Sequence, residues 1–139
     1  MHKMLPAIAV LMGASLASCA VKASPQHALS ETSWRFVTID GESPTSRSAK
    51  LVFHADRLGA SVGCNHMGGP WRIEEGRLVS GPLVQTEMYC AGPVWNQEQA
   101  VNTLLSAAPK IEQDGNRLAI RSSGHFAELE QLSLPLQGS

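Results

Sequence analysis

Residues 63–71 read Gly-Cys-Asn-His-Met-Gly-Gly-Pro-Trp, and this stretch concentrates the unusual residues of the chain. Downstream, the segment Gln85-Thr86-Glu87-Met88-Tyr89-Cys90 supplies a further cysteine at the end of a strand-like run. We interpret Asn65 and its neighbouring glycines as turn residues, because these types tolerate positive φ. The sequence therefore predicts two loops, 63–71 and 85–92, that lie side by side if Cys64 and Cys90 are bonded.

Residues 1–18 have the pattern of an export signal. Lys3 precedes an apolar run from Met4 to Leu16, and small residues follow this run. A membrane-spanning helix needs about 20 apolar residues, so the run is too short to be one. We expect these residues to be removed from the mature protein.

The sequence Leu16-Ala17-Ser18-Cys19 resembles the lipobox of bacterial lipoproteins. This resemblance implies cleavage before Cys19 and attachment of diacylglycerol and a further acyl chain, such as palmitate, to that residue. Ala20 follows, which in lipoproteins of this type favours the outer membrane, so we expect a lipid-anchored protein facing the periplasm, with residues 19–32 as a polar tether. The competing interpretation is an ordinary secretory signal that leaves Cys19 as an unpaired thiol.

With Cys19 assigned to lipid, an even number of cysteines remains in an oxidising compartment, which predicts a Cys64–Cys90 disulfide. Closing this loop should stabilise the fold by roughly 3.5 kcal/mol on the chain-entropy model. Small domains have a net stability of only about 5–15 kcal/mol, so this contribution is large. The alternative is a metal site built from both cysteines, His66 and His54, but the sequence has no Cys-x-x-Cys or paired-histidine motif.

The charge balance gives no sign of nucleic-acid binding. The full chain has a formal charge of −1, and removal of the signal with its single Lys3 lowers the charge to −2. Gly68-Gly69 lacks both the Walker lysine pattern and the dinucleotide-binding spacing, so we expect no cofactor. The globular part, residues 33–132, is long enough for one domain with a small core.

The pattern of apolar residues and turn signals predicts short strands around one main helix. Residues 94–108 are the expected helix, with Pro93 in its first turn and Pro109 after its end. The expected strands are residues 34–39, 50–54, 58–64, 71–74, 77–79, 83–86, 110–112, 118–120 and 126–132. We expect an α+β domain in which a small antiparallel β-sheet curls into a barrel-like shape. Residues 133–139 should form a flexible tail.

Several motifs in this order resemble the META domain, the family of HslJ-like heat-shock lipoproteins, over about residues 34–132. They are Gly63-Cys64-Asn65, Gly69 with Trp71, Thr86-x-Met88-x-Cys90, a helix bearing Glu98 and Leu104-Leu105, and Leu118-x-Ile120. Trp71 stands where the family more often has tyrosine, and Tyr89 where a small residue is usual. The resemblance implies a small envelope domain, linked in some members to heat shock and other stress responses, with no established reaction.

We expect the function to reside in a surface formed by the two cross-linked loops and not in a catalytic group. Methionine and aromatic side chains on a rigid loop suit recognition of an apolar partner, here an envelope protein, a peptide or a lipid. The candidate interaction residues are His66, Met67, Trp71, Glu87 and Tyr89. Some side chains of the two loops should be core, and Trp71 and Met88 are the ones we expect there. The alternatives are an inhibitor of an envelope enzyme, and a thiol or hydrolytic enzyme that uses Cys64 and a histidine. Glu98 on the helix is a separate candidate for a general base, although a structural carboxylate is the more common case.

Overall fold

The computed structural model describes residues 6, 9–10, 13–20, 22–122 and 124–133. The strands are β1 Thr32–Ile39, β2 Lys50–Phe53, β3 Arg57–Ser61, β4 His66–Glu74, β5 Arg77–Ser80, β6 Val84–Gln85, β7 Lys110–Asp114, β8 Arg117–Ser122 and β9 His125–Gln131. The helices are α1 Pro25–Leu29 and α2 Pro93–Ser106. Most of the predicted flexible tail, residues 134–139, lies outside the described residues.

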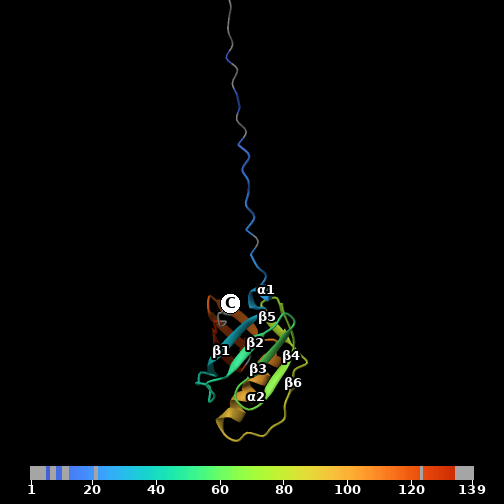
Figure 1. The fold of residues 1–139 in the computed structure, drawn as a ribbon, viewed down its shortest axis with the longest axis vertical. Coiled ribbons are helices and arrows are strands. Elements are labelled where there is room, and N and C mark those ends of the chain that lie inside the picture. Colours follow the sequence, from blue (N-terminus) through green and yellow to red (C-terminus); the bar gives the residue numbers. More distant parts are fainter. Residues whose placement is uncertain (1–5, 7–8, 11–12, 21, 123, 134–139) are drawn as a thin grey trace, which may run out of the picture.

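Eight antiparallel strands close into a barrel. Their order is β3-β2-β1-β9-β8-β7-β5-β4, and β4 pairs back onto β3, while the short β6 also pairs with β4 (Figure 1). Closure leaves the eight strands of the ring without a free edge. The prediction of a barrel-like antiparallel sheet with one main helix is confirmed, but the domain is mostly β, so the α+β label is a loose fit.

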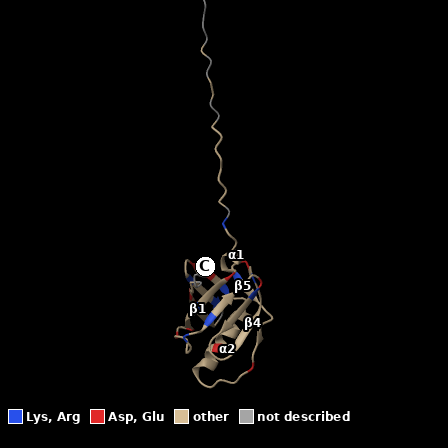
Figure 2. Cartoon of the chain, in the orientation of Figure 1, with Lys and Arg blue, Asp and Glu red and all other residues tan. Residues whose placement is uncertain are grey.

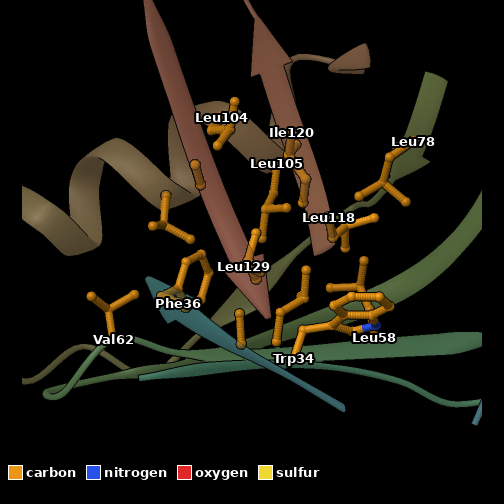
Figure 3. Close-up of a cluster of buried hydrophobic side chains, with 14 of the residues drawn as sticks. Trp34, Phe36, Leu58, Val62, Leu78, Leu104, Leu105, Leu118, Ile120 and Leu129 are labelled. Carbon is orange, nitrogen blue, oxygen red and sulfur yellow. The ribbon is translucent and has the colours of Figure 1, made fainter. Parts of the chain in front are cut away.

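The core fills the barrel with side chains from alternate positions of the strands. Trp34, Leu51 and Phe53 are fully buried on the β1–β2 side. Figure 3 shows Leu104 and Leu105 of α2 reaching toward the side chains of β8 and β9. This confirms that the predicted helix packs its leucine pair into the core.

The two helices lie at opposite ends of the barrel (Figure 1). At the end where β1, β3 and β5 finish, α2 contacts the connecting loops: the Gln97 side chain accepts a hydrogen bond from Thr45 N–H, and the Leu105 carbonyl accepts one from the Ser80 hydroxyl. The short α1 lies beside β4 at the other end, where the N-terminal chain joins the domain. We call these the α2 end and the α1 end.

The predicted tether, residues 19–32, is wrong from Pro25 onward because α1 belongs to the folded domain. The Ser24 hydroxyl caps the helix by accepting the His27 N–H, and Leu29 is only 3% exposed. The Gln26 side chain also accepts the Ile73 N–H at 2.7 Å, which attaches α1 to β4. The polar composition of this segment gave no sign of the single buried leucine, and the folded part therefore begins at Pro25 and not at residue 33.

The stretch 63–71, which we predicted to be a loop, is mostly strand β4. The two glycines within β4, Gly68 and Gly69, mark close approaches between backbones and not a turn. A Cβ on Gly69 would lie 2.5 Å from the Pro82 carbonyl oxygen, and one on Gly68 would lie 3.0 Å from the Leu58 carbonyl oxygen. The glycine-rich sequence is therefore compatible with a strand because neighbouring backbones occupy the space of the missing side chains.

Candidate functional site

The disulfide between Cys64 and Cys90 is present, which confirms the predicted cross-link. The Cα atoms of the two residues are 6.2 Å apart. The bond joins the β3–β4 connection to the segment 86–92, which leads from β6 into α2. The two connections therefore lie side by side at the α2 end, and the thiolates that a metal site would require are not available.

Asn65 fixes segment 86–92 through its side chain. Its Oδ1 accepts the Met88 N–H and its Nδ2 donates to the Met88 carbonyl, both at 2.8 Å. The side-chain amide thus forms the two hydrogen bonds with the Met88 backbone that a residue of a neighbouring strand would form. Oδ1 also accepts the Thr86 hydroxyl at 2.8 Å. We had interpreted Asn65 as a positive-φ turn residue, but it is absent from the residues with positive φ, whereas Gly63 has a φ of 141°.

Glu98 of α2 lies completely buried behind this connection. Its carboxylate accepts three N–H groups: the Asn65 backbone at 2.7 Å, the Asn65 side chain at 2.6 Å and the Gln85 side chain at 2.8 Å. Asn102, one helical turn further along α2, donates to Gln85 at 2.7 Å. Such hydrogen bonds offset the cost of removing a carboxylate from water. We call Asn65, Gln85, Thr86, Glu98 and Asn102 the Glu98 cluster, in which Asn65 and Glu98 are buried, Gln85 and Asn102 are half-buried and Thr86 is exposed. The cluster fastens α2 to both connections.

A hollow of about 530 Å³ opens to solvent beside the Glu98 cluster. Met88 is 57% exposed and Tyr89 is 81% exposed at its rim. The ring of Tyr89 lies against that of Trp95, with centroids 5.5 Å apart and ring planes at 50°. The hollow is lined by members of the cluster together with Leu83, Glu87, Met88, Tyr89, Trp95 and Gln99. We call the group of Glu87, Met88, Tyr89, Trp95 and Gln99 the mouth surface.

The candidate residues that we predicted divide into exposed and buried groups. His66, Glu87 and Tyr89 are exposed, whereas Met67 and Trp71 are buried in the core and do not belong to an exposed surface. For Trp71 this confirms the expectation that it is a core residue; for Met67 the prediction is wrong. The cause is the alternation of β4, which directs positions 67, 69 and 71 inward and position 66 outward.

Trp71 is a core residue with a fixed orientation. Its ring packs edge-on against Phe53 at a centroid distance of 4.7 Å, and its Nε1–H donates to the His54 carbonyl at 2.9 Å. Met88 shows the reverse error: we expected it in the core, but it is exposed because segment 86–92 passes outside the barrel end.

Three residues of α2 that line the hollow are not among the predicted interaction residues: Trp95, Gln99 and Asn102. A signal was available, because these residues follow one another at spacings of four and three along the predicted helix and therefore share one face. That face adjoins the connection which the disulfide holds against α2.

Among the described residues, no group of three or more histidine, cysteine, aspartate or glutamate side chains is arranged to hold a metal ion. In that same part of the chain, no helix has the length and apolar character needed to cross a membrane. His54 and His66 lie on the outer face of the barrel, where they line a separate shallow hollow over β2, β3 and β4.

A model of the META domain family matches residues 27–133. Two solved structures have a similar fold. One, described as an NMR structure of a protein, has a TM-score of 0.69 and 18% identity, and the alignment covers 78% of this chain and 95% of that chain. The other, an NMR structure of a protein from Burkholderia xenovorans, has a TM-score of 0.64 and 20% identity, covering 88% of this chain and 100% of that chain. No curated protein matches the sequence. At these identities the likeness establishes the fold alone.

Proposed function

This chain belongs to the META domain family, and from that premise we propose that it is a non-catalytic, HslJ-like envelope protein which binds another envelope component through the mouth surface. The proposal includes anchoring to the outer membrane by lipid on Cys19, with the domain facing the periplasm and serving stress tolerance. The lipobox-like sequence at residues 16–19, followed by Ala20, supports the anchor. Cys19 is exposed and forms no disulfide, as an acylated residue requires.

The exposure of Met88 and Tyr89 on a fixed segment is the observation that carries the binding proposal. Single exposed apolar side chains are common and need no explanation. Here, however, the segment is held by the disulfide, by the Asn65 side chain and by a hydrogen bond from Thr86 N–H to the His66 carbonyl at 3.0 Å. A surface that is already ordered loses little conformational entropy when it binds a partner.

The same geometry supports a non-catalytic role. Both oxygens of Glu98 accept hydrogen bonds from structural groups, and the residue has no contact with solvent. Cys64 is bonded to Cys90 and offers no thiolate for nucleophilic attack. The thiol-enzyme alternative requires a free thiol in the domain, so thiol titration of protein isolated under native conditions distinguishes the two functions.

The position of the anchor determines which way the mouth surface points. Because α1 begins at Pro25, only residues 20–24 separate Cys19 from the domain, and a chain of this length spans at most roughly 17 Å. The tether joins the α1 end, and the mouth surface lies at the α2 end (Figure 1). With lipid on Cys19, the mouth surface faces away from the anchoring leaflet, toward the periplasm.

Capture of partners from chemically cross-linked envelopes tests the binding proposal. We expect the double substitution Met88→Ala with Tyr89→Ala to reduce capture at least about fivefold. Leu132→Ala is the matched control, because it removes a partly exposed apolar side chain close to the α1 end. Equal capture by the wild type and the double variant, with both folded, would contradict the proposal.

The anchor needs its own test, which is mass spectrometry of the mature N-terminus. We expect the mature chain to begin at Cys19 with acyl chains on this residue. A mature chain that starts elsewhere, or an unmodified Cys19, would refute the anchoring proposal and leave the binding proposal intact.

A further inference from the structure

We infer that the mouth surface binds a neutral saccharide, the glycan portion of an envelope polymer. This inference rests on the proposed function and names the class of ligand for the same surface. The hollow has a volume of about 530 Å³, within the range of roughly 300–1,000 Å³ found for small-ligand sites. Three properties of its lining select a saccharide: an aromatic platform, polar groups that are not used within the fold, and the absence of cations.

Tyr89 and Trp95 form the aromatic platform. Their rings are in contact at a tilt, and Tyr89 is largely exposed, so ring surface remains open to a ligand. A pyranose ring presents a flat face of C–H groups, which are weakly positive and pack on the negative face of an aromatic ring. The platform comes from two different elements, and the disulfide and α2 fix their relative positions.

Unused hydrogen-bonding groups surround this platform. The Gln99 amide, the Trp95 Nε1–H, the Tyr89 hydroxyl and the Asn102 Oδ1 have no hydrogen-bond partner in the part of the chain that the structure describes. Together they offer donors and acceptors in a mixed set. Saccharide hydroxyls both donate and accept, so they match such a set. An apolar peptide side chain or an acyl chain would leave these groups without partners, which costs binding free energy.

The lining of the hollow contains no lysine or arginine, which disfavours anionic ligands. Residues 78–109 contain no lysine or arginine, and the charged residues in this range are Glu87 and Glu98. Figure 2 shows many of the basic residues along the strands and toward the α1 end; at the α2 end, α2 and segment 86–92 carry acidic and neutral residues, and Arg47 lies in the β1–β2 connection, which contacts α2 through Thr45. A phosphate, a phospholipid headgroup or an acidic peptide would meet Glu87 and no lysine or arginine in this lining.

The inner wall of the hollow is rigid. Gln85 is held between Glu98 and Asn102 by hydrogen bonds at both ends of its amide, so these groups are already oriented before a ligand arrives. Gln99 lies one turn before Asn102 on the same helix and is directed to the same side. A saccharide stacked on the aromatic platform is therefore within reach of amides on α2.

The three tryptophan indoles allow a direct test by NMR on the full ¹⁵N-labelled chain purified in detergent. Trp34 Nε1–H donates to Thr32 and Trp71 Nε1–H donates to the His54 carbonyl, so both signals report on the core. The Trp95 indole reports on the hollow. We expect tri-N-acetylchitotriose or maltotriose to shift the Trp95 signal saturably, while the Trp34 and Trp71 signals stay in place.

Variants locate the binding. Tyr89→Ala and Gln99→Ala should each raise the dissociation constant at least about tenfold. Gln113→Ala, which removes an exposed amide on β7, should leave it unchanged. Equal affinity of Gln99→Ala and the wild type, or shifts confined to Trp34 and Trp71, would overturn the assignment of this site.

Other ligands separate this inference from the proposed function. A neutral apolar peptide, or vesicles of phosphatidylethanolamine and phosphatidylglycerol, should leave the Trp95 signal unchanged. If either probe shifts that signal and neither saccharide does, the saccharide class is wrong but the binding surface is correct. If no probe shifts it and capture from envelopes is also insensitive to the Met88 and Tyr89 substitutions, both proposals fail; if capture is sensitive, only the saccharide inference fails.

Discussion

Replacement of Glu98 by glutamine should destabilise the domain although the two side chains have nearly the same shape. The carboxylate accepts three N–H groups, two at Oε1 and one at Oε2. Glutamine supplies one oxygen and one NH₂ group. If its oxygen takes the place of Oε1, its NH₂ faces the Asn65 backbone N–H; in the reverse orientation its NH₂ faces two donors. Rotation of the Asn65 amide gives no relief, because its Oδ1 already accepts from Thr86 and Met88.

The better orientation sets the magnitude. One buried N–H loses its partner, which costs about 1–3 kcal/mol. The two remaining hydrogen bonds change from a charged to a neutral acceptor, which weakens each by about 1 kcal/mol. The neutral amide is easier to bury than a carboxylate, which offsets part of this loss. We expect Glu98→Gln to lower the free energy of unfolding by about 2 kcal/mol.

Urea unfolding, followed by far-UV circular dichroism, measures this difference. Glu87→Gln is the matched control: it makes the same chemical change on an exposed side chain, and its effect should stay within about 0.5 kcal/mol. The reasoning is refuted if Glu98→Gln also stays within 0.5 kcal/mol of the wild type with an unchanged denaturant slope. Assays of function on Glu98→Gln must therefore be corrected for its folded fraction.

Three further predictions concern stability and use the same assay. Cys64→Ser and Cys90→Ser should each lower the free energy of unfolding by roughly 2–5 kcal/mol. The double variant should lose little more than either single variant, because all three lack the same disulfide; additive losses would indicate separate roles for the two cysteines. Gly69→Ala should lower the free energy of unfolding by more than about 2 kcal/mol, because its Cβ would lie 2.5 Å from a backbone carbonyl oxygen. In the control Gly59→Ala the nearest atom to the new Cβ is 4.0 Å away, and the loss should be less than about 1 kcal/mol. Equal losses in the two variants would contradict the close approach at Gly69. Leu29→Ala should cost about 2–4 kcal/mol, and a loss below 0.5 kcal/mol would show that α1 is not part of the core.

The elements that could be predicted from the sequence are those with local signals. The prolines at positions 93 and 109 bound the main helix, and apolar runs between turn residues located most strands. The α1 helix had too little local signal: five residues form it, and one buried leucine with a capping serine determines its position. Its stability comes from tertiary contact with β4, which no local pattern expresses.

The sequence predicted which two segments lie side by side, but not which of their side chains are exposed. The expected export signal and the cysteine count predicted the Cys64–Cys90 pair, and this bond holds the two connections together. Whether His66 or Met67 is exposed depends on the register of β4, because a shift of one residue in the alternation exchanges buried for exposed side chains. Treating residues 63–71 as a loop removed that alternation from consideration.

Segment 86–92 crosses the end of a closed barrel, where the ring of strands offers it no free edge. Asn65 supplies the missing backbone partner to Met88, and Glu98 in turn holds Asn65 through two hydrogen bonds. A buried charge of this kind often adds no more stability than an apolar side chain of similar size. Its effect here is positional, because the carboxylate can satisfy its three donors in only one arrangement of α2 and the two connections. The disulfide limits the same movement by a covalent bond. Two independent constraints thus act on one short segment, and the exposed side chains that they hold in place are Met88 and Tyr89 of the mouth surface.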